Sequence, residues 1–291
     1  MRWDASALFV IVGGTGCSLF VDTDALTGGA RTASSPDGGA EGGSVLVDAS
    51  PPRETGSTVP SEAGAEPSDG GGDGDPLSSA VLADGPIAYF RFAETAGISS
   101  ANVVPGGKGT CLVSNTAVWG ATGVAGTRGL ELATSETLVT ISGLVTDLGK
   151  SYSIELWLRK TTAANGLLVT HADDPFNVGG QITGKNLMWW NDSKVRTETW
   201  NKYQLLSYTL MDTGSPVDTW VHVVYGFDAA KMVDFTLVDG VPSTGGASPS
   251  NRPSVSAAIV IGHWQGYLDE VAIYDKALTQ ERAAAHRALA P

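Results

Sequence analysis

The chain has 291 residues, 42% of them hydrophobic, and a formal net charge of −13. This length is enough for one all-β domain with a hydrophobic core. Eighteen lysines and arginines against 31 acidic residues argue against binding to nucleic acid or to an anionic membrane surface. Two cysteines, Cys17 and Cys111, exclude a fold built on a disulfide framework.

Residues 1–17 are typical of a bacterial export signal. Arg2 gives a positive start, Ala5–Val12 is mainly apolar, and small residues precede Cys17. The pattern resembles the lipobox of bacterial lipoproteins, which implies that Cys17 becomes the acylated N-terminus of a cell-envelope protein. Cleaved secretion without a lipid is the alternative. The run 9–16 also resembles a dinucleotide-binding turn, but the Gly/Ser/Pro tract after it excludes the required βαβ unit.

Residues 18–76 are predicted to form an acidic linker rich in glycine, serine and proline. This stretch holds eleven acidic and two basic residues, so most of the net charge lies here. Such a segment buries too little apolar surface to offset the entropy of ordering, which predicts an extended, unfolded spacer. Asp69–Asp75 alternates aspartate with glycine, but it lacks the terminal glutamate and flanking helices of an EF-hand, so we interpret it as linker.

Residues 77–291 are predicted to form one all-β domain. Short apolar runs bounded by Gly, Pro, Asn and Asp recur to the end of the chain, as in β-sandwiches. The alternation over 152–158 predicts a half-buried strand. Asp239-Gly240 predicts a hairpin turn. The only helix expected lies over 279–289, after the N-cap Thr279.

The segment 266–274, Gly-Tyr-Leu-Asp-Glu-Val-Ala-Ile-Tyr, resembles the closing strand of LamG-like jellyroll domains in the laminin-G / concanavalin A-like lectin superfamily. Segments 88–94, 152–158 and 220–224 match the same family in the same order. The resemblance covers residues 84–290. It implies a two-sheet antiparallel jellyroll sandwich with a short C-terminal helix, which recognises carbohydrate or protein and sometimes binds calcium. Asn102 stands where the family carries a loop aspartate.

No pattern predicts catalysis. Glycosidases of this fold carry paired acids as Glu-x-Asp-x-x-Glu on one strand, and the chain has no such run. Glu155 stands alone, while Asp269 and Glu270 are adjacent and are expected on opposite faces of a strand. We interpret these two acids as hydrogen-bonding groups that tie the ends of the domain together. The four histidines share no metal-ligand spacing, so His222 is expected to be structural and Cys111 a buried thiol.

The segment 171–203 contains the candidate ligand-binding residues. Aromatic faces stack on the C–H faces of sugars, while amides and carboxylates bind the hydroxyls. We predict ligand contacts from seven residues: Trp189, Trp190, Asn191, Asp192, Arg196, Trp200 and Tyr203. The alternative is that these tryptophans fill the core. Asp173 and Asp174 are the candidate calcium ligands, with an ordinary solvated turn as the alternative.

Together these features predict a non-catalytic carbohydrate-binding module, surface-anchored or secreted, whose partner is a glycan or an extracellular protein. Membrane contact is expected only through an N-terminal lipid. One alternative is a structural or adhesive domain without a sugar site, and another is a polysaccharide hydrolase or lyase, which the missing acid pair disfavours. The isolated tryptophans are predicted to be core residues: Trp119, Trp157, Trp220 and Trp264.

Overall fold

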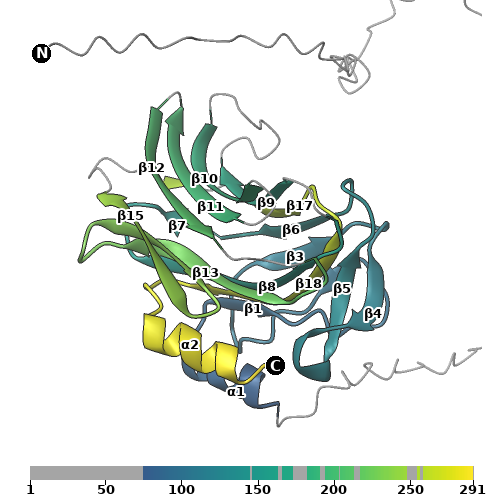
Figure 1. Ribbon diagram of the computed structural model, residues 1–291. Helices are drawn as coiled ribbons and strands as arrows, with labels where there is room; N and C mark the ends of the chain where they lie inside the picture. Colours follow the sequence, from purple (N-terminus) through teal and green to yellow (C-terminus); the bar gives the residue numbers. More distant parts are fainter. Residues whose placement is uncertain are drawn as a thin grey trace, which may run out of the picture. The chain divides into compact units, whose positions relative to one another are not determined.

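The computed structural model describes residues 75–144, 146–162, 166–172, 182–190, 194–202, 204–212, 217–247, 254–255 and 258–290. All of them belong to one unit, Ala63–Pro291. Two large antiparallel sheets lie face to face, and two helices cover the outer side of one sheet (Figure 1). This arrangement confirms the predicted two-sheet jellyroll sandwich.

Sheet A has the strand order β15-β14-β13-β8-β18-β5-β4, and β1 pairs with β18. Its strands are β1 (Ala88–Phe90), β4 (Val118–Thr122), β5 (Arg128–Leu132), β8 (Tyr152–Lys160), β13 (Val221–Asp228), β14 (Val233–Val238), β15 (Val241–Ala247) and β18 (Gly266–Tyr274).

Sheet B has the strand order β12-β11-β10-β9-β17-β6-β3-β2. Its strands are β2 (Ser99–Ser100), β3 (Thr110–Val113), β6 (Leu138–Ser142), β9 (Gly166–Ala172), β10 (Ile182–Trp190), β11 (Lys194–Lys202), β12 (Gln204–Asp212) and β17 (Ile259–Gly262). A separate pair is made by β7 (Thr146–Asp147) and β16 (Ser254–Val255), and the helices are α1 (Pro76–Ala83), the 3₁₀ turn η2 (Val124–Gly126) and α2 (Gln280–Ala288).

Apolar side chains form two layers, one between the sheets and one between sheet A and the helices. Strand β8 contributes to both layers. Its residues Ile154, Leu156 and Leu158 face sheet B, whereas Trp157 faces the helices. The prediction of a half-buried strand was therefore wrong, because the helices cover the face that a bare sandwich would expose to solvent.

The four isolated tryptophans divide into two groups. Trp157 and Trp264 are buried, which confirms their assignment to the core. Trp119 packs partly buried against the layer between the sheets, and Trp220 packs partly buried against the layer beneath the helices. Cys111 is a buried free thiol, as predicted, and burial raises its pKa to about 12.

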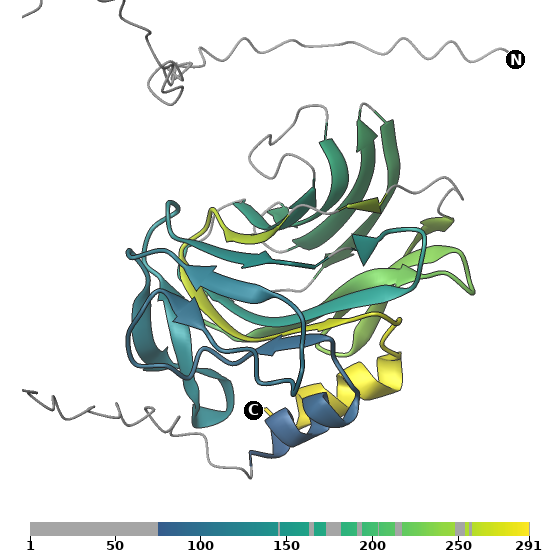
Figure 2. The same ribbon diagram turned by 180° about the vertical axis from the view of Figure 1, so that it is seen from behind.

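Helix α1 corrects the expectation of a single helix. Its N-cap is Asp75, whose side chain accepts a hydrogen bond from the Leu77 amide, and Pro76 occupies the first helical position. An acidic cap followed by proline is a standard helix start. The signal was missed because it lies where the acidic, proline-containing linker was expected to end. Figure 2 shows α1 and α2 side by side on the outer face of sheet A.

Strand β18 contains a β-bulge that corrects a second expectation. The pairing with β8 shifts register between Asp269 and Ala272, and Glu270 has a φ of 51°. The extra residue changes the phase of the strand, so Leu268 before the bulge and Val271 after it both face the core. Asp269 and Glu270 consequently lie on the same outer side of sheet A and not on opposite faces.

Candidate functional site

The candidate site lies on the outer face of sheet B, where β10, β11 and β12 run side by side (Figure 1). Alternate residues of β11 point into the sandwich, because the Thr197 hydroxyl contacts Thr236 of sheet A and Thr199 donates to Asp234. The residues between and beside them, Arg196, Glu198 and Trp200, therefore point outward.

These outward residues form one hydrogen-bonded group. Glu198 forms an ion pair with the Arg196 guanidinium at 2.5 Å and accepts a hydrogen bond from the Trp200 indole nitrogen at 2.9 Å. The Arg196 guanidinium lies over the Tyr208 ring of β12, 5.1 Å from its centre. Glu198 thus fixes a cation and an indole, and the cation in turn lies on a second aromatic ring, which is 52% exposed as a residue.

The same face continues inward across β10 and β9. Tyr208, Glu198, Asn186 and Thr170 are successive cross-strand partners, so their side chains share one face. Asn186 is 5% exposed and Thr170 is 2% exposed. The Asn186 side-chain oxygen and the Thr170 hydroxyl have no hydrogen-bond partner among the described residues. Buried polar atoms without partners are uncommon, and ligands or waters often satisfy them.

We call these six residues the β11 face: Thr170, Asn186, Arg196, Glu198, Trp200 and Tyr208. Exposure decreases across this face, from the exposed aromatic ring of Tyr208 to the buried hydroxyl of Thr170. Within these six residues the charges of Arg196 and Glu198 cancel. A neutral molecule that combines apolar surface with hydroxyl groups matches this composition.

The structure brings together two of the seven predicted ligand-binding residues, Arg196 and Trp200. Trp189 and Trp190 end β10 opposite Val195 and Lys194, and their side chains lie outside the described residues. Also outside the described residues are Asn191, Asp192, Tyr203, the calcium candidates Asp173 and Asp174, and Cys17.

Sequence reasoning missed Glu198, although the signal was present. Arg196, Glu198 and Trp200 are spaced two residues apart, which places them on one face once β11 is recognised as a strand. Asn186 and Tyr208 had no such signal, because their proximity depends on the registers of two strand pairs.

A second polar cluster lies beneath the helices. The Glu155 carboxylate is bonded to His222 at 2.6 Å, to the Tyr274 hydroxyl at 2.6 Å and to His286 at 2.9 Å. Burial alone would raise the pKa of Glu155, but the two histidines outweigh it and hold the pKa well below its usual value. Glu155 and both histidines are 0–1% exposed. The cluster joins α2 to sheet A, which confirms the structural interpretation of His222.

The Asp269–Glu270 pair is also buried and structural. Asp269 accepts from the Val124 amide at 2.9 Å and from the Thr127 hydroxyl at 3.1 Å. Glu270 bonds the Tyr89 hydroxyl and lies 3.4 Å from Arg91, so it ties β18 to the start of the domain, as predicted.

Burial raises the pKa of Glu270 to about 7, although Arg91 and Tyr89 act in the opposite direction. Burial, together with Glu270, also raises the pKa of Asp269. The two residues are 0% and 2% exposed, so neither carboxylate faces a surface where a substrate could dock.

Within the ranges given above, no group of three or more His, Cys, Asp or Glu residues has the geometry of a metal site. Asn102, which replaces the family's loop aspartate, organises its own loop instead: its side-chain oxygen accepts from the amides of Tyr89 and Val104. None of the described helices is long and apolar enough to cross a membrane.

The two facing antiparallel sheets define the class of β-sandwich domains. A family model described as the concanavalin A-like lectin/glucanases superfamily matches residues 133–284. The chain belongs to this superfamily, as its LamG-like motifs predicted. A search of curated proteins found no match.

Solved structures with the same fold include several toxin domains. The botulinum neurotoxin serotype D ligand-binding domain in complex with N-acetylneuraminic acid has a TM-score of 0.55 and 12% identity, covering 72% of this chain and 52% of that one. The serotype D binding domain has a TM-score of 0.54 and 11% identity, covering 70% and 52%. The chain thus spans about half the length of these domains.

A smaller neighbour is matched over nearly its whole length. Domain 4 of AbnA, an extracellular arabinanase from Geobacillus stearothermophilus solved with arabinotriose, has a TM-score of 0.51 and 18% identity. The match covers 69% of this chain and 98% of that domain. At identities this low, the structural likeness shows the shared fold alone.

Proposed function

We propose that the domain is a non-catalytic carbohydrate-binding module and that the β11 face is its sugar-binding site. The observation that carries the proposal is the group of Trp200 and Tyr208 around the Arg196–Glu198 pair. Aromatic rings give apolar contact to a sugar ring, and fixed polar groups bind its hydroxyls.

One observation from the comparisons and one from the structure support binding without catalysis. The neurotoxin neighbours are described as binding domains, one of them in complex with N-acetylneuraminic acid, and the arabinanase domain was solved with arabinotriose. The adjacent acids of this chain, Asp269 and Glu270, are engaged in structural hydrogen bonds. A glycan is therefore the partner that we propose first.

Replacement of Trp200 by alanine tests the site. Loss of one stacking ring should weaken glycan binding by about 1–3 kcal/mol. The unfolding temperature should change little, because Trp200 is only partly buried. Glycan-array binding and calorimetric titration of the full chain measure the first effect, and thermal unfolding measures the second.

Trp119→Ala is the matched control. Trp119 is also partly buried, but it lies on β4 of sheet A and packs toward Phe92. This variant should lose stability and keep glycan affinity. If Trp200→Ala instead unfolds early with unchanged affinity, the ring is packing and the sugar site is rejected. Failure of the wild-type chain to bind any glycan would favour an adhesive, protein-binding role.

We also propose that the module is displayed outside the cytoplasm on a lipid anchor at Cys17, through a spacer formed by residues 18–76. The apolar run and small residues before Cys17 support the anchor, and the spacer's acidic composition supports an extended chain. The extracellular origin of the arabinanase domain agrees with this location.

Mass spectrometry of the native protein tests the anchor. A diacyl or triacyl cysteine at position 17 is expected as the first residue, and Cys17→Ala should release the protein from the membrane fraction. Retention of residues 1–16 in the native protein would contradict both the lipoprotein and the cleaved-signal interpretations.

A further inference from the structure

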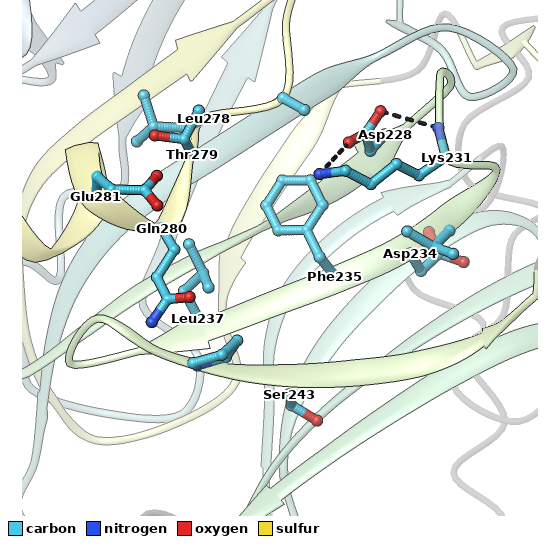
Figure 3. A pocket seen from close by; sticks show the side chains of 13 residues that line it. Asp228, Lys231, Asp234, Phe235, Leu237, Ser243, Leu278, Thr279, Gln280 and Glu281 are labelled. Atoms are coloured by element: carbon cyan, nitrogen blue, oxygen red, sulfur yellow. Dashed lines mark hydrogen bonds and ion pairs between the residues drawn. The ribbon is translucent and has the colours of Figure 1, made fainter.

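A pocket of about 390 Å³ lies on the outer face of sheet A, on the opposite side of the sandwich from the β11 face. It is bounded by the β13–β14 turn, by β14 and β15, and by the start of α2 (Figure 3). The volume falls within the range of small-ligand sites, roughly 300–1,000 Å³.

The pocket has an apolar floor. The ring of Phe235 projects from β14 between the α2 side and the Lys231 side of the pocket, as Figure 3 shows. Leu278 and Leu237 complete the floor, and both are 4% exposed. Phe235 is only partly buried, so part of the ring remains available to a ligand.

Planar polar side chains surround this floor. The Asp228 carboxylate is fixed by the backbone amides of Ala230 and Lys231, at 3.0 and 3.2 Å, and by the Lys231 ammonium at 3.0 Å. Glu281 and Gln280 approach from α2. The side chain of Gln280 is exposed at the rim.

The charges of the rim exclude an anion as the natural ligand. Hydrogen bonds from its own backbone N–H and from Thr279 lower the pKa of Glu281, so its carboxylate is charged and already occupies the positive end of α2. Burial acts to raise the pKa of Asp228, but Lys231 and backbone amides together outweigh it, so the net shift is downward. Two carboxylates face one ammonium, which leaves the rim negative.

We infer that this pocket is a second carbohydrate site, which takes a single neutral sugar ring with its C–H face on Phe235. Asp228 and Gln280 bind the hydroxyls, and Lys231 contributes donors at the rim. An uncharged ring can contact the apolar floor and donate hydrogen bonds to the acceptors of the rim. The carboxylate of a uronic or sialic acid would instead be repelled by the carboxylates of Asp228 and Glu281. The site is independent of the β11 face, so the module would hold two sugars on opposite sides.

Fluorine NMR of the full chain, labelled with 4-fluorophenylalanine, tests the pocket. The probes are the methyl glycosides of glucose, galactose, mannose and arabinose, with glucuronic acid as the anionic counterpart. The Phe235 signal is identified by its absence in Phe235→Leu. At least one neutral glycoside should shift this signal in a saturable manner, and glucuronic acid should bind at least about tenfold more weakly, the factor for 1.4 kcal/mol.

One variant and two controls make the outcome decisive. Gln280→Ala should weaken binding about tenfold. Because Gln280 is exposed, this variant should fold normally, and it keeps the Phe235 signal as the readout. Val241→Ala, an exposed residue of β15 that does not line the pocket, should bind normally. Trp200→Ala should also keep the Phe235 shift, which separates this site from the β11 face.

Three results would overturn the inference. They are the absence of any saturable shift of the Phe235 signal, binding of glucuronic acid as tight as that of the neutral glycosides, and unchanged affinity in Gln280→Ala.

Discussion

At the residue scale, the β11 face depends on a polar group directly beneath it. The Lys185 ammonium crosses from β10 to sheet A, where it lies 2.6 Å from the Asp234 carboxylate and 3.0 Å from the Gly226 carbonyl. Both charged side chains are 1% exposed. The hydroxyls of Thr197, Thr209 and Thr236 form a second buried group between the same two sheets. These polar contacts attach strands β10–β12 to sheet A in addition to the apolar core contacts of Leu187 and Val195.

The Lys185–Asp234 pair should be sensitive to loss of one partner. Asp234→Leu leaves a buried ammonium without its carboxylate, which should cost about 3–5 kcal/mol of unfolding free energy. The double variant Lys185→Met/Asp234→Leu should lose less than the single variant, because no unpaired charge remains. Guanidinium chloride unfolding measures both effects.

Lys150→Ala is the control for this pair. Lys150 forms an exposed ion pair with Asp147, in which the lysine side chain is 81% exposed, so its loss should cost no more than about 1 kcal/mol. An Asp234→Leu variant as stable as Lys150→Ala would show that the buried pair does not hold the sheets together.

Sequence reasoning identified part of the candidate site because aromatic and polar residues are concentrated between positions 186 and 203. Arg196 and Trp200 share the β11 face, as that concentration suggested. Lys185 could not be recognised, because a lysine within a polar run is expected at the surface and its acid partner is 49 residues away. Polar contacts between distant strands follow from register, which local sequence does not encode.

At the element scale, local patterns predicted strands and turns well. Asp239-Gly240 joins β14 to β15 with φ values of 50° and 77°, and positive φ at both positions is what a type I′ hairpin turn requires. The bulge in β18 was not predicted, although Asp269-Glu270 interrupts an apolar alternation there. Two adjacent acids in a strand can mark a β-bulge, after which the side chains alternate in the opposite order. Here the bulge keeps both acids out of the core between the sheets.

Asp84 joins the two helices. Its two carboxylate oxygens both accept from the Arg282 Nε, at 2.9 and 2.8 Å, and one of them lies 3.0 Å from the His286 Nε2. Asp84→Ala should destabilise the domain by about 1.5–3 kcal/mol, the usual range for hydrogen bonds to charged groups. Hydrogen exchange should accelerate first in α1 and α2. Urea unfolding gives the free energy, and exchange measured by mass spectrometry gives the location.

Asp275→Ala provides the comparison for Asp84. Asp275 is an exposed aspartate between β18 and α2, and its replacement should change stability by less than about 0.5 kcal/mol. Equal stability of the two variants would mean that the helices are held by the apolar layer alone.

At the scale of the whole molecule, the helices turn sheet A into a layer buried on both sides. This burial encloses several ionisable groups, including Glu155, His286, Asp269 and Glu270. The two proposed sugar sites lie on the outer faces of different sheets, so neither needs these buried groups for binding. The groups should instead govern how the stability of the domain changes with pH.

The predicted pH profile follows from three pKa shifts. The pKa of Glu155 is lowered, because hydrogen bonds from two histidines outweigh its burial, so its stabilisation is lost as pH falls below the unfolded value of 4.5. Burial lowers the pKa of His286, but Glu155 and Asp84 outweigh it, so the net shift is upward and stabilisation declines as pH rises above 6.5. Burial raises the pKa of Glu270 to about 7, and its contribution therefore declines between pH 4.5 and 7.

Unfolding temperature should therefore be highest near pH 4.5 and should fall by a few degrees from there toward about pH 8. Thermal unfolding followed by circular dichroism from about pH 3 to 9 measures this profile. Glu270→Gln should flatten the decline between pH 4.5 and 7, and His286→Gln should flatten the decline above pH 6.5, because each removes a group that is protonated more readily in the folded state. The control Glu136→Gln, at an exposed glutamate, should keep the wild-type shape. A maximum above pH 7 in the wild-type chain would contradict the upward shifts of Glu270 and His286, because stability would then rise where those groups lose their protons.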